Sequence, residues 1–127
     1  MLAMKTWAIV GLGDNPARDA YDVAAQLIAN GHQVVPVHPL AKSVHGQKAY
    51  ALLADIPFPV DVVDVFVNSS LAGQIADEAV AIGAKGVWFQ LGVIDQAAYQ
   101  RVKNAGLLMV MDRCPVIELR SQSSEKA

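Results

Sequence analysis

The chain has 127 residues, 54% of them hydrophobic and 17% charged, which is enough to bury one sizeable core but hardly two. Its net charge of -2 argues against general nucleic-acid binding, which requires a strongly basic face. No apolar run approaches the ~20 residues of a membrane-spanning helix, so we expect one domain that has neither nucleic acid nor membrane as a partner.

The first residues predict a cytoplasmic location. Residues 1–5 run straight into a strand-like segment and leave no room for the charged region, apolar region and cleavage site of a signal peptide. The single cysteine, Cys114, can form no internal disulfide, as is typical of proteins in a reducing compartment.

In the first third of the chain, two predicted strands flank a helix. Residues 6–10 form an apolar run that ends at Gly11, as expected of a strand buried on both faces. Residues 21–30 carry apolar side chains at helical spacing, and a glycine follows as a stop signal. Residues 33–37 form the second strand, where Pro36 must lie at a position that needs no N–H in the ladder.

The remaining two thirds continue the alternation of strands and helices. Three further strands are predicted at residues 61–67, 86–89 and 107–111. Ser69 or Ser70 can cap the helix that follows the third strand and continues to Ile82. Asp95 can cap the next helix, which reaches Ala105.

This alternation predicts an α/β fold, a single Rossmann-like doubly wound parallel β-sheet of about five strands with helices on both faces. The domain is expected to span residues 1–120, with residues 121–127 as a polar, disordered tail. Ligands of such sheets bind outside the carboxyl ends of the strands, where the strand order reverses. We expect the loops after the first and fourth strands to flank that point.

The loop after the first strand is the strongest candidate site. Gly11 and Gly13 allow a sharp turn and a close approach to a ligand, and the following helix N-terminus offers N–H groups to a phosphate. Asn15 is a candidate cap for that helix, with Pro16 at its first position. Arg18 then lies in the first turn, where it can bond a phosphate oxygen. A tight strand-to-helix turn without a ligand is the alternative interpretation.

Two absences bear on which nucleotide this loop would bind. The dinucleotide fingerprint requires a small residue where this chain has Pro16, and an acid about twenty residues further on. Neither is present, since the second strand ends at Val37 and His38, Lys42 follows, and residues 23–54 contain no Asp or Glu. A neutral-to-basic edge suits the 3′-phosphate of coenzyme A (CoA) and the 2′-phosphate of NADP equally well.

Several motifs along residues 6–118 carry a family resemblance. They are Ile9-Val10-Gly11 with Asp14, Pro16, Arg18 and Tyr21; Val35-Pro36-Val37-His38-Pro39; Leu53-Ala54-Asp55-Ile56-Pro57; Val60-Asp61-Val62-Val63-Asp64-Val65-Phe66; Ala81-Ile82-Gly83-Ala84-Lys85; Trp88-Phe89-Gln90-Leu91-Gly92; and Val110-Met111-Asp112-Arg113-Cys114-Pro115. Together they resemble the small stand-alone bacterial CoA-binding proteins, which are similar to the N-terminal domain of the succinyl-CoA synthetase α subunit.

The resemblance implies CoA or an acyl-CoA as the ligand and assigns residues to its parts. Phosphate would be held by Gly11, Gly13, Asp14, Asn15 and Arg18, and the nucleoside would be bordered by Val37, His38, Pro39 and Lys42. We expect Gln90 and Gly92, after the fourth strand, to contact the pantetheine arm. Family members commonly have a serine in place of Gly13 and an arginine in place of Asn68, so this chain lacks two phosphate donors. One lost hydrogen bond to a charged group weakens binding by about 1.5–3 kcal/mol.

No convincing catalytic constellation or metal motif is present, because Gly-x-Ser-x-Gly, Cys-x-x-Cys and His-Glu-x-x-His spacings are all missing. Cys114 beside Arg113 can be read as a partner for the CoA thiol, but a small buried hydrophobe is the favoured interpretation. His38 is equally a ligand contact or an ordinary exposed loop residue.

The sequence thus predicts a non-catalytic CoA or acyl-CoA binding module that acts as a carrier or sensor. Its macromolecular partner would be a second copy of the chain or an acyl-CoA enzyme. The alternatives are an NADP- or NAD-binding oxidoreductase or redox sensor, and a degenerate fold kept for protein contacts.

Overall fold

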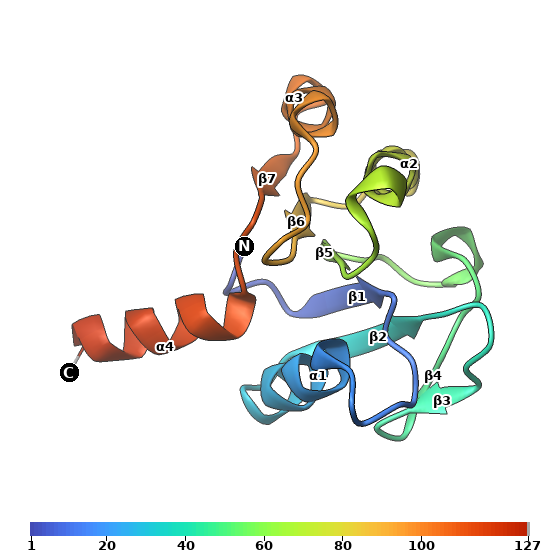
Figure 1. The fold of residues 1–127 in the computed structure, drawn as a ribbon, viewed down its shortest axis with the longest axis vertical. Coiled ribbons are helices and arrows are strands. Elements are labelled where there is room, and N and C mark those ends of the chain that lie inside the picture. The colour runs from blue at the N-terminus through green and yellow to red at the C-terminus, as the bar shows by residue number, and fades with distance from the viewer. Residues whose placement is uncertain (127) are drawn as a thin grey trace.

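Five parallel strands form the central sheet of the computed structural model, which describes residues 1–126 (Figure 1). The strands are β1 (Thr6–Val10), β2 (Gln33–Val37), β5 (Val62–Val65), β6 (Gly86–Phe89) and β7 (Leu108–Val110). The predicted bounds of β1, β2 and β6 are confirmed, and β5 and β7 are shorter than predicted at both ends. Nearly all strand residues are buried, as in a sheet that is covered on both faces.

Four helices cover the two faces of the sheet. They are α1 (Asp19–Ala29), α2 (Ser69–Ala81), α3 (Gln96–Asn104) and α4 (Pro115–Lys126). The apolar side chains of α1 and α4 belong to one core cluster and those of α2 and α3 to the other, so the two pairs lie on opposite faces (Figure 1). The predicted α/β doubly wound fold is confirmed.

The strand order is β2-β1-β5-β6-β7, and every neighbouring pair in it is parallel. From β1 the chain moves outward to β2, at one edge of the sheet. It then crosses to the other side of β1, where β5, β6 and β7 follow in order. The order therefore reverses between β1 and β5, which is where ligands of open α/β sheets bind. The expectation that the loops after the first and fourth strands flank this point is wrong, because the third of the five strands is the neighbour of β1.

The connection from β2 to β5 contains no α-helix. It is built from a two-stranded hairpin, β3 (Ser43–Val44) with β4 (Gln47–Lys48), followed by a short 3₁₀ turn, η1 (Leu53–Asp55). The Tyr50 N–H donates to the Pro36 carbonyl at 3.0 Å and so ties this connection to the outer edge of β2. Pro36 directs its missing N–H away from β1, as the sequence requires.

The helix starts differ in part from the predicted ones. Asp95 caps α3 by accepting from the Ala98 N–H at 3.0 Å, as predicted. The cap of α2 is Asn68, not a serine, because its side-chain oxygen accepts from the Ser70 N–H at 3.0 Å. Asn15 does not cap α1, since its side chain accepts from the Ala17 N–H within a turn that precedes the helix.

The last helix, α4, extends through Lys126, where the sequence predicts an irregular polar tail from residue 121. Val116 and Leu119 pack into the core and nucleate this helix, and propagation through following polar residues costs little. The structure thus assigns helix to residues 121–126, and residue 127 lies outside the described part of the chain. Within residues 1–126, no helix is long and apolar enough to cross a membrane.

A carboxyl group is buried in the middle of the sheet. Asp64 lies on β5 between Ile9 of β1 and Trp88 of β6, and its side chain is fully buried. Neither carboxyl oxygen has a hydrogen-bond partner among the described residues. Loss of hydration raises the pKa of Asp64 well above its usual value, so burial favours the uncharged, protonated form of this side chain.

Candidate functional site

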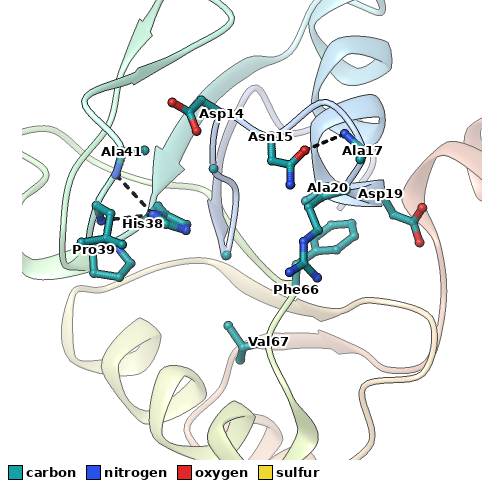
Figure 2. A pocket seen from close by; sticks show the side chains of 14 residues that line it. Asp14, Asn15, Ala17, Asp19, Ala20, His38, Pro39, Ala41, Phe66 and Val67 are labelled. Carbon is teal, nitrogen blue, oxygen red and sulfur yellow. Dashed lines mark hydrogen bonds between the residues drawn. The ribbon is translucent and has the colours of Figure 1, made fainter.

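A cavity of about 820 Å³ lies at the carboxyl edge of the sheet, where the strand order reverses. We call it the loop cavity. It is lined by Gly11, Gly13, Asp14, Asn15, Ala17, Arg18, Asp19, Ala20, His38, Pro39, Leu40, Ala41, Phe66 and Val67. Figure 2 shows His38 and Asn15 on opposite sides of the loop after β1, with Val67 approaching from the end of β5.

Gly11 is required by the protein's own backbone. Its φ of +98° is a conformation that favours glycine, and a Cβ there would lie 2.5 Å from the Phe66 carbonyl oxygen. The Gly11 N–H also donates to the Val37 carbonyl at 2.9 Å. The loop is therefore held tightly between β2 and β5, so the tight-turn interpretation explains Gly11 without any ligand.

Gly13 has a different reason for being small. A Cβ at this position would lie 3.1 Å from both Cδ2 and Nε2 of His38. The His38 Nδ1 atom accepts hydrogen bonds from the N–H groups of Leu40 and Ala41, at 3.1 and 3.2 Å. A neutral imidazole that accepts at Nδ1 carries its proton on Nε2. The Nε2–H donor of His38 therefore lies beside Gly13 at the cavity wall.

Among the described residues that line the cavity, Arg18 alone has a cationic side chain. It occupies the N-cap position of α1, and among the side chains that the structure describes it pairs with no carboxylate. In the first turn of α1 the Tyr21 N–H donates to the Arg18 carbonyl, while the N–H groups of Asp19 and Ala20 have no acceptor among the described residues. A guanidinium next to a helix N-terminus can bind an anion such as a phosphate.

Two exposed carboxylates also line the loop cavity, those of Asp14 and Asp19. Figure 2 shows them at opposite ends of the group, with Asp14 beside the loop after β1 and Asp19 at the start of α1. A carboxylate repels a phosphate, so Asp14 can contribute to an anion site through its backbone N–H but not through its side chain.

Five of the predicted site residues do not line the loop cavity, and three of them, Val37, Lys42 and Asn68, do not line the neighbouring cavity described below either. Val37 is 4% exposed and belongs to the core beneath it, while Lys42 lies outside the lining. Asn68 uses its side-chain oxygen to cap α2. Conversely, Phe66 and Val67 line the cavity although sequence reasoning passed over them. They follow β5 directly, and only the strand order reveals that this strand neighbours β1.

Gln90 and Gly92 line a second cavity of about 430 Å³, which we call the Cys114 cavity. Its lining consists of Asp19, Asp22, Val23, Phe66, Val67, Gln90, Leu91, Gly92, Val93, Cys114 and Ile117. The two cavities share Asp19, Phe66 and Val67, so they are adjacent. The structure therefore separates the predicted site residues into two neighbouring cavities.

Comparison with known proteins finds relatives that match most of the chain. The model of a CoA-binding domain family matches residues 5–120. The uncharacterized protein YneT of Bacillus subtilis (strain 168) is 34% identical over 110 residues, which cover 87% of this chain and 82% of that protein. A solved structure of a hypothetical protein from Pyrococcus horikoshii OT3 is 37% identical, with a TM-score of 0.90 over 94% of this chain and 84% of that one.

A more distant likeness concerns the fold alone. The apo form of a dinucleotide-forming acetyl-coenzyme A synthetase 1 from Ca. Korarchaeum cryptofilum is 22% identical, with a TM-score of 0.71. The match covers 84% of this chain but 26% of that one, so this fold also occurs as one part of a larger enzyme. From the family match along nearly its whole length, the chain belongs to the CoA-binding domain family.

Proposed function

We propose that the protein binds CoA or an acyl-CoA in the loop cavity as a non-catalytic module, a carrier or sensor or the partner of an acyl-CoA enzyme. One observation carries this proposal: the glycine loop, Arg18 and His38 meet in one cavity at the point of strand reversal. The family match to residues 5–120 supports the same ligand class.

In this proposal the diphosphate lies between Gly13 and the N-terminus of α1. Arg18 donates to one phosphate, and the N–H groups of the loop and of the first helical turn donate to the other. The Nε2–H group of His38 adds a donor beside Gly13, where related proteins commonly carry a serine hydroxyl. This chain thereby recovers a donor that its sequence lacks at position 13.

The nucleoside is proposed to lie along His38 and Pro39, which line the cavity at the end of β2. Val37 is buried beneath them, and the exposed Lys42, which follows in the chain, is proposed to bond a ribose 3′-phosphate. An NAD-type ligand is disfavoured because His38 stands where an acid would bond the ribose hydroxyls.

Calorimetry with CoA, acetyl-CoA, NAD and NADP tests the proposal. We expect CoA or acetyl-CoA to bind the unmodified protein, and Arg18→Ala to weaken that binding by about 1.5–3 kcal/mol, roughly ten- to a hundredfold. Arg101→Ala is the matched control, because Arg101 pairs with Asp77 and lines neither cavity.

Two results would contradict the proposal. If NADP bound and CoA and acetyl-CoA did not, the ligand of the loop cavity would be a nicotinamide nucleotide. An unchanged CoA affinity in the Arg18→Ala variant, with folding verified by circular dichroism, would mean that the phosphate is bound elsewhere.

A further inference from the structure

The Cys114 cavity contains a buried polar group without a partner. Gln90 is 7% exposed and lines this cavity, and its Oε1 atom has no hydrogen-bond partner among the described residues. A buried amide oxygen without a partner costs about 1–3 kcal/mol, so an unsatisfied amide side chain beside a cavity points to a polar ligand that hydrogen-bonds to it.

Cys114 lies in the wall of the same cavity and is partly buried against the core, so it is less buried than the small buried hydrophobe that the sequence favours. Two long-range contacts hold its segment in place. The Trp88 Nε1 atom donates to the Arg113 carbonyl at 2.8 Å, and the Gly92 N–H donates to Asp112 Oδ1 at 2.7 Å. These bonds position the thiol next to the loop that carries Gln90.

Charge separates the two cavities. The loop cavity contains Arg18 beside the carboxylates of Asp14 and Asp19, whereas the described residues give the Cys114 cavity the carboxylates of Asp19 and Asp22 and no cationic side chain. Of the two cavities, the loop cavity with its cation is therefore the better place for a phosphate. The exposed Leu91 and Ile117 side chains make the wall of the Cys114 cavity suitable for an uncharged, partly apolar segment with amide groups.

We propose that Cys114 is a thiol–disulfide exchange site for the thiol end of the ligand, with Gln90 positioning that end. The inference rests on the proposed function, because CoA bound by its phosphates in the loop cavity directs its pantetheine arm into the adjacent cavity. The pantetheine amides can donate to Gln90 Oε1, and its terminal sulfur then lies near Cys114.

The co-reactant is the disulfide form of the ligand, and the exchange is balanced without any other oxidant. The Cys114 thiol loses its proton, and its sulfur attacks the pantetheine sulfur of the disulfide. The original S–S bond breaks as a bond from Cys114 Sγ to the pantetheine sulfur forms. The departing thiolate takes up a proton, which leaves a mixed disulfide on the protein and one free thiol.

The test compares the rates at which CoA disulfide and oxidised glutathione modify Cys114, followed by intact-mass spectrometry and peptide mapping. We expect CoA disulfide to react about tenfold faster or more, because binding brings the sulfurs together. Adenosine 3′,5′-bisphosphate competes for the loop cavity, so it should remove the faster reaction of CoA disulfide. It should not slow the reaction of Cys114 with oxidised glutathione. Cys114→Ser should abolish both adducts.

Gln90→Leu distinguishes positioning from simple thiol reactivity. The substitution removes the amide at similar size. We expect it to slow the reaction of Cys114 with CoA disulfide by about two- to tenfold, the effect of one hydrogen bond, and to leave the reaction with oxidised glutathione unchanged. Gln100→Leu is the matched control, because Gln100 is exposed on α3 and lines neither cavity.

Equal rates for the two disulfides in a protein that binds CoA by calorimetry would overturn the inference and leave the proposed function intact. Absence of CoA binding in both the unmodified protein and the Cys114→Ser variant would overturn the proposed function, and this inference with it.

Discussion

The imidazole of His38 fills the space beside Gly13, so that a Cβ at position 13 would lie 3.1 Å from its Cδ2 and Nε2 atoms. Two backbone N–H groups hold the ring there through Nδ1. The histidine and the glycine are therefore coupled, and replacement of one changes the effect of replacing the other.

Gly13→Ser tests this coupling. In the unmodified protein the added atoms displace the His38 ring, and we expect CoA affinity to fall although a hydroxyl donor is gained. In a His38→Ala background, which by itself weakens binding about two- to tenfold, the same substitution should tighten binding. Calorimetry on the four proteins measures the coupling, and an equal effect of Gly13→Ser in both backgrounds would contradict it.

Asp19→Asn should strengthen CoA binding. The Asp19 carboxylate is exposed at the junction of the two cavities, and its removal relieves repulsion of a phosphate near Arg18. We expect a gain of about 0.3–1 kcal/mol, or two- to fivefold, at low ionic strength, shrinking as salt screens the charges. Asp55→Asn, at an exposed position outside both cavities, is the control. An equal gain in CoA affinity in that variant would mean that the effect comes from the net charge of the protein and not from the position of Asp19.

Asp64→Asn should change how stability depends on pH. Because burial raises the pKa of Asp64 above 3.8, the folded protein keeps this proton in a range where the unfolded chain has released it. This carboxyl therefore destabilises the fold as pH rises from about 4 toward its folded-state pKa.

Denaturant titrations at a series of pH values measure this effect. The free energy of unfolding of Asp64→Asn, relative to the unmodified protein, should increase by up to about 1.4 kcal/mol per pH unit across that range. Parallel pH profiles for the two proteins would show that Asp64 is ionised in the fold.

Asp61→Ala should have the opposite pH dependence. The Asp61 carboxylate accepts from the Thr6 N–H at 3.0 Å, and this bond lowers the pKa of Asp61 with help from Lys85 at 3.3 Å, against the effect of burial. The stability it contributes is present above pH 3.8 and is lost as pH falls through the lowered pKa.

At pH 7 we expect Asp61→Ala to lower the free energy of unfolding by about 1–2 kcal/mol, since the Thr6 N–H loses its partner. Lys85→Ala should cost less than about 0.5 kcal/mol, because Lys85 is 67% exposed and the pair is screened by water. Equal losses in the two variants would assign the stability to the ion pair instead.

Local patterns in the sequence determined most elements of this fold. The apolar runs of β1, β2 and β6 stop at a turn signal or a change to polar residues, so their bounds could be read directly. The Asp95 cap was equally clear, because a capping side chain bonds a backbone N–H only three residues away. The glycine loop, with Arg18 next to it, was found in the same way.

The tertiary structure decided which of these residues meet. The hairpin of β3 and β4 has two-residue strands and is held to β2 by the Tyr50 contact, which no local pattern indicates. The strand order brought Phe66 and Val67 to the loop cavity and left Lys42 outside it.

The proximity of His38 to Gly13, and the cavity that Cys114 and Gln90 both line, likewise depend on how distant segments pack together. Elements follow from interactions within a few residues, which the sequence displays in order. The site depends on which strand ends become neighbours in the sheet, and packing of the whole chain determines that.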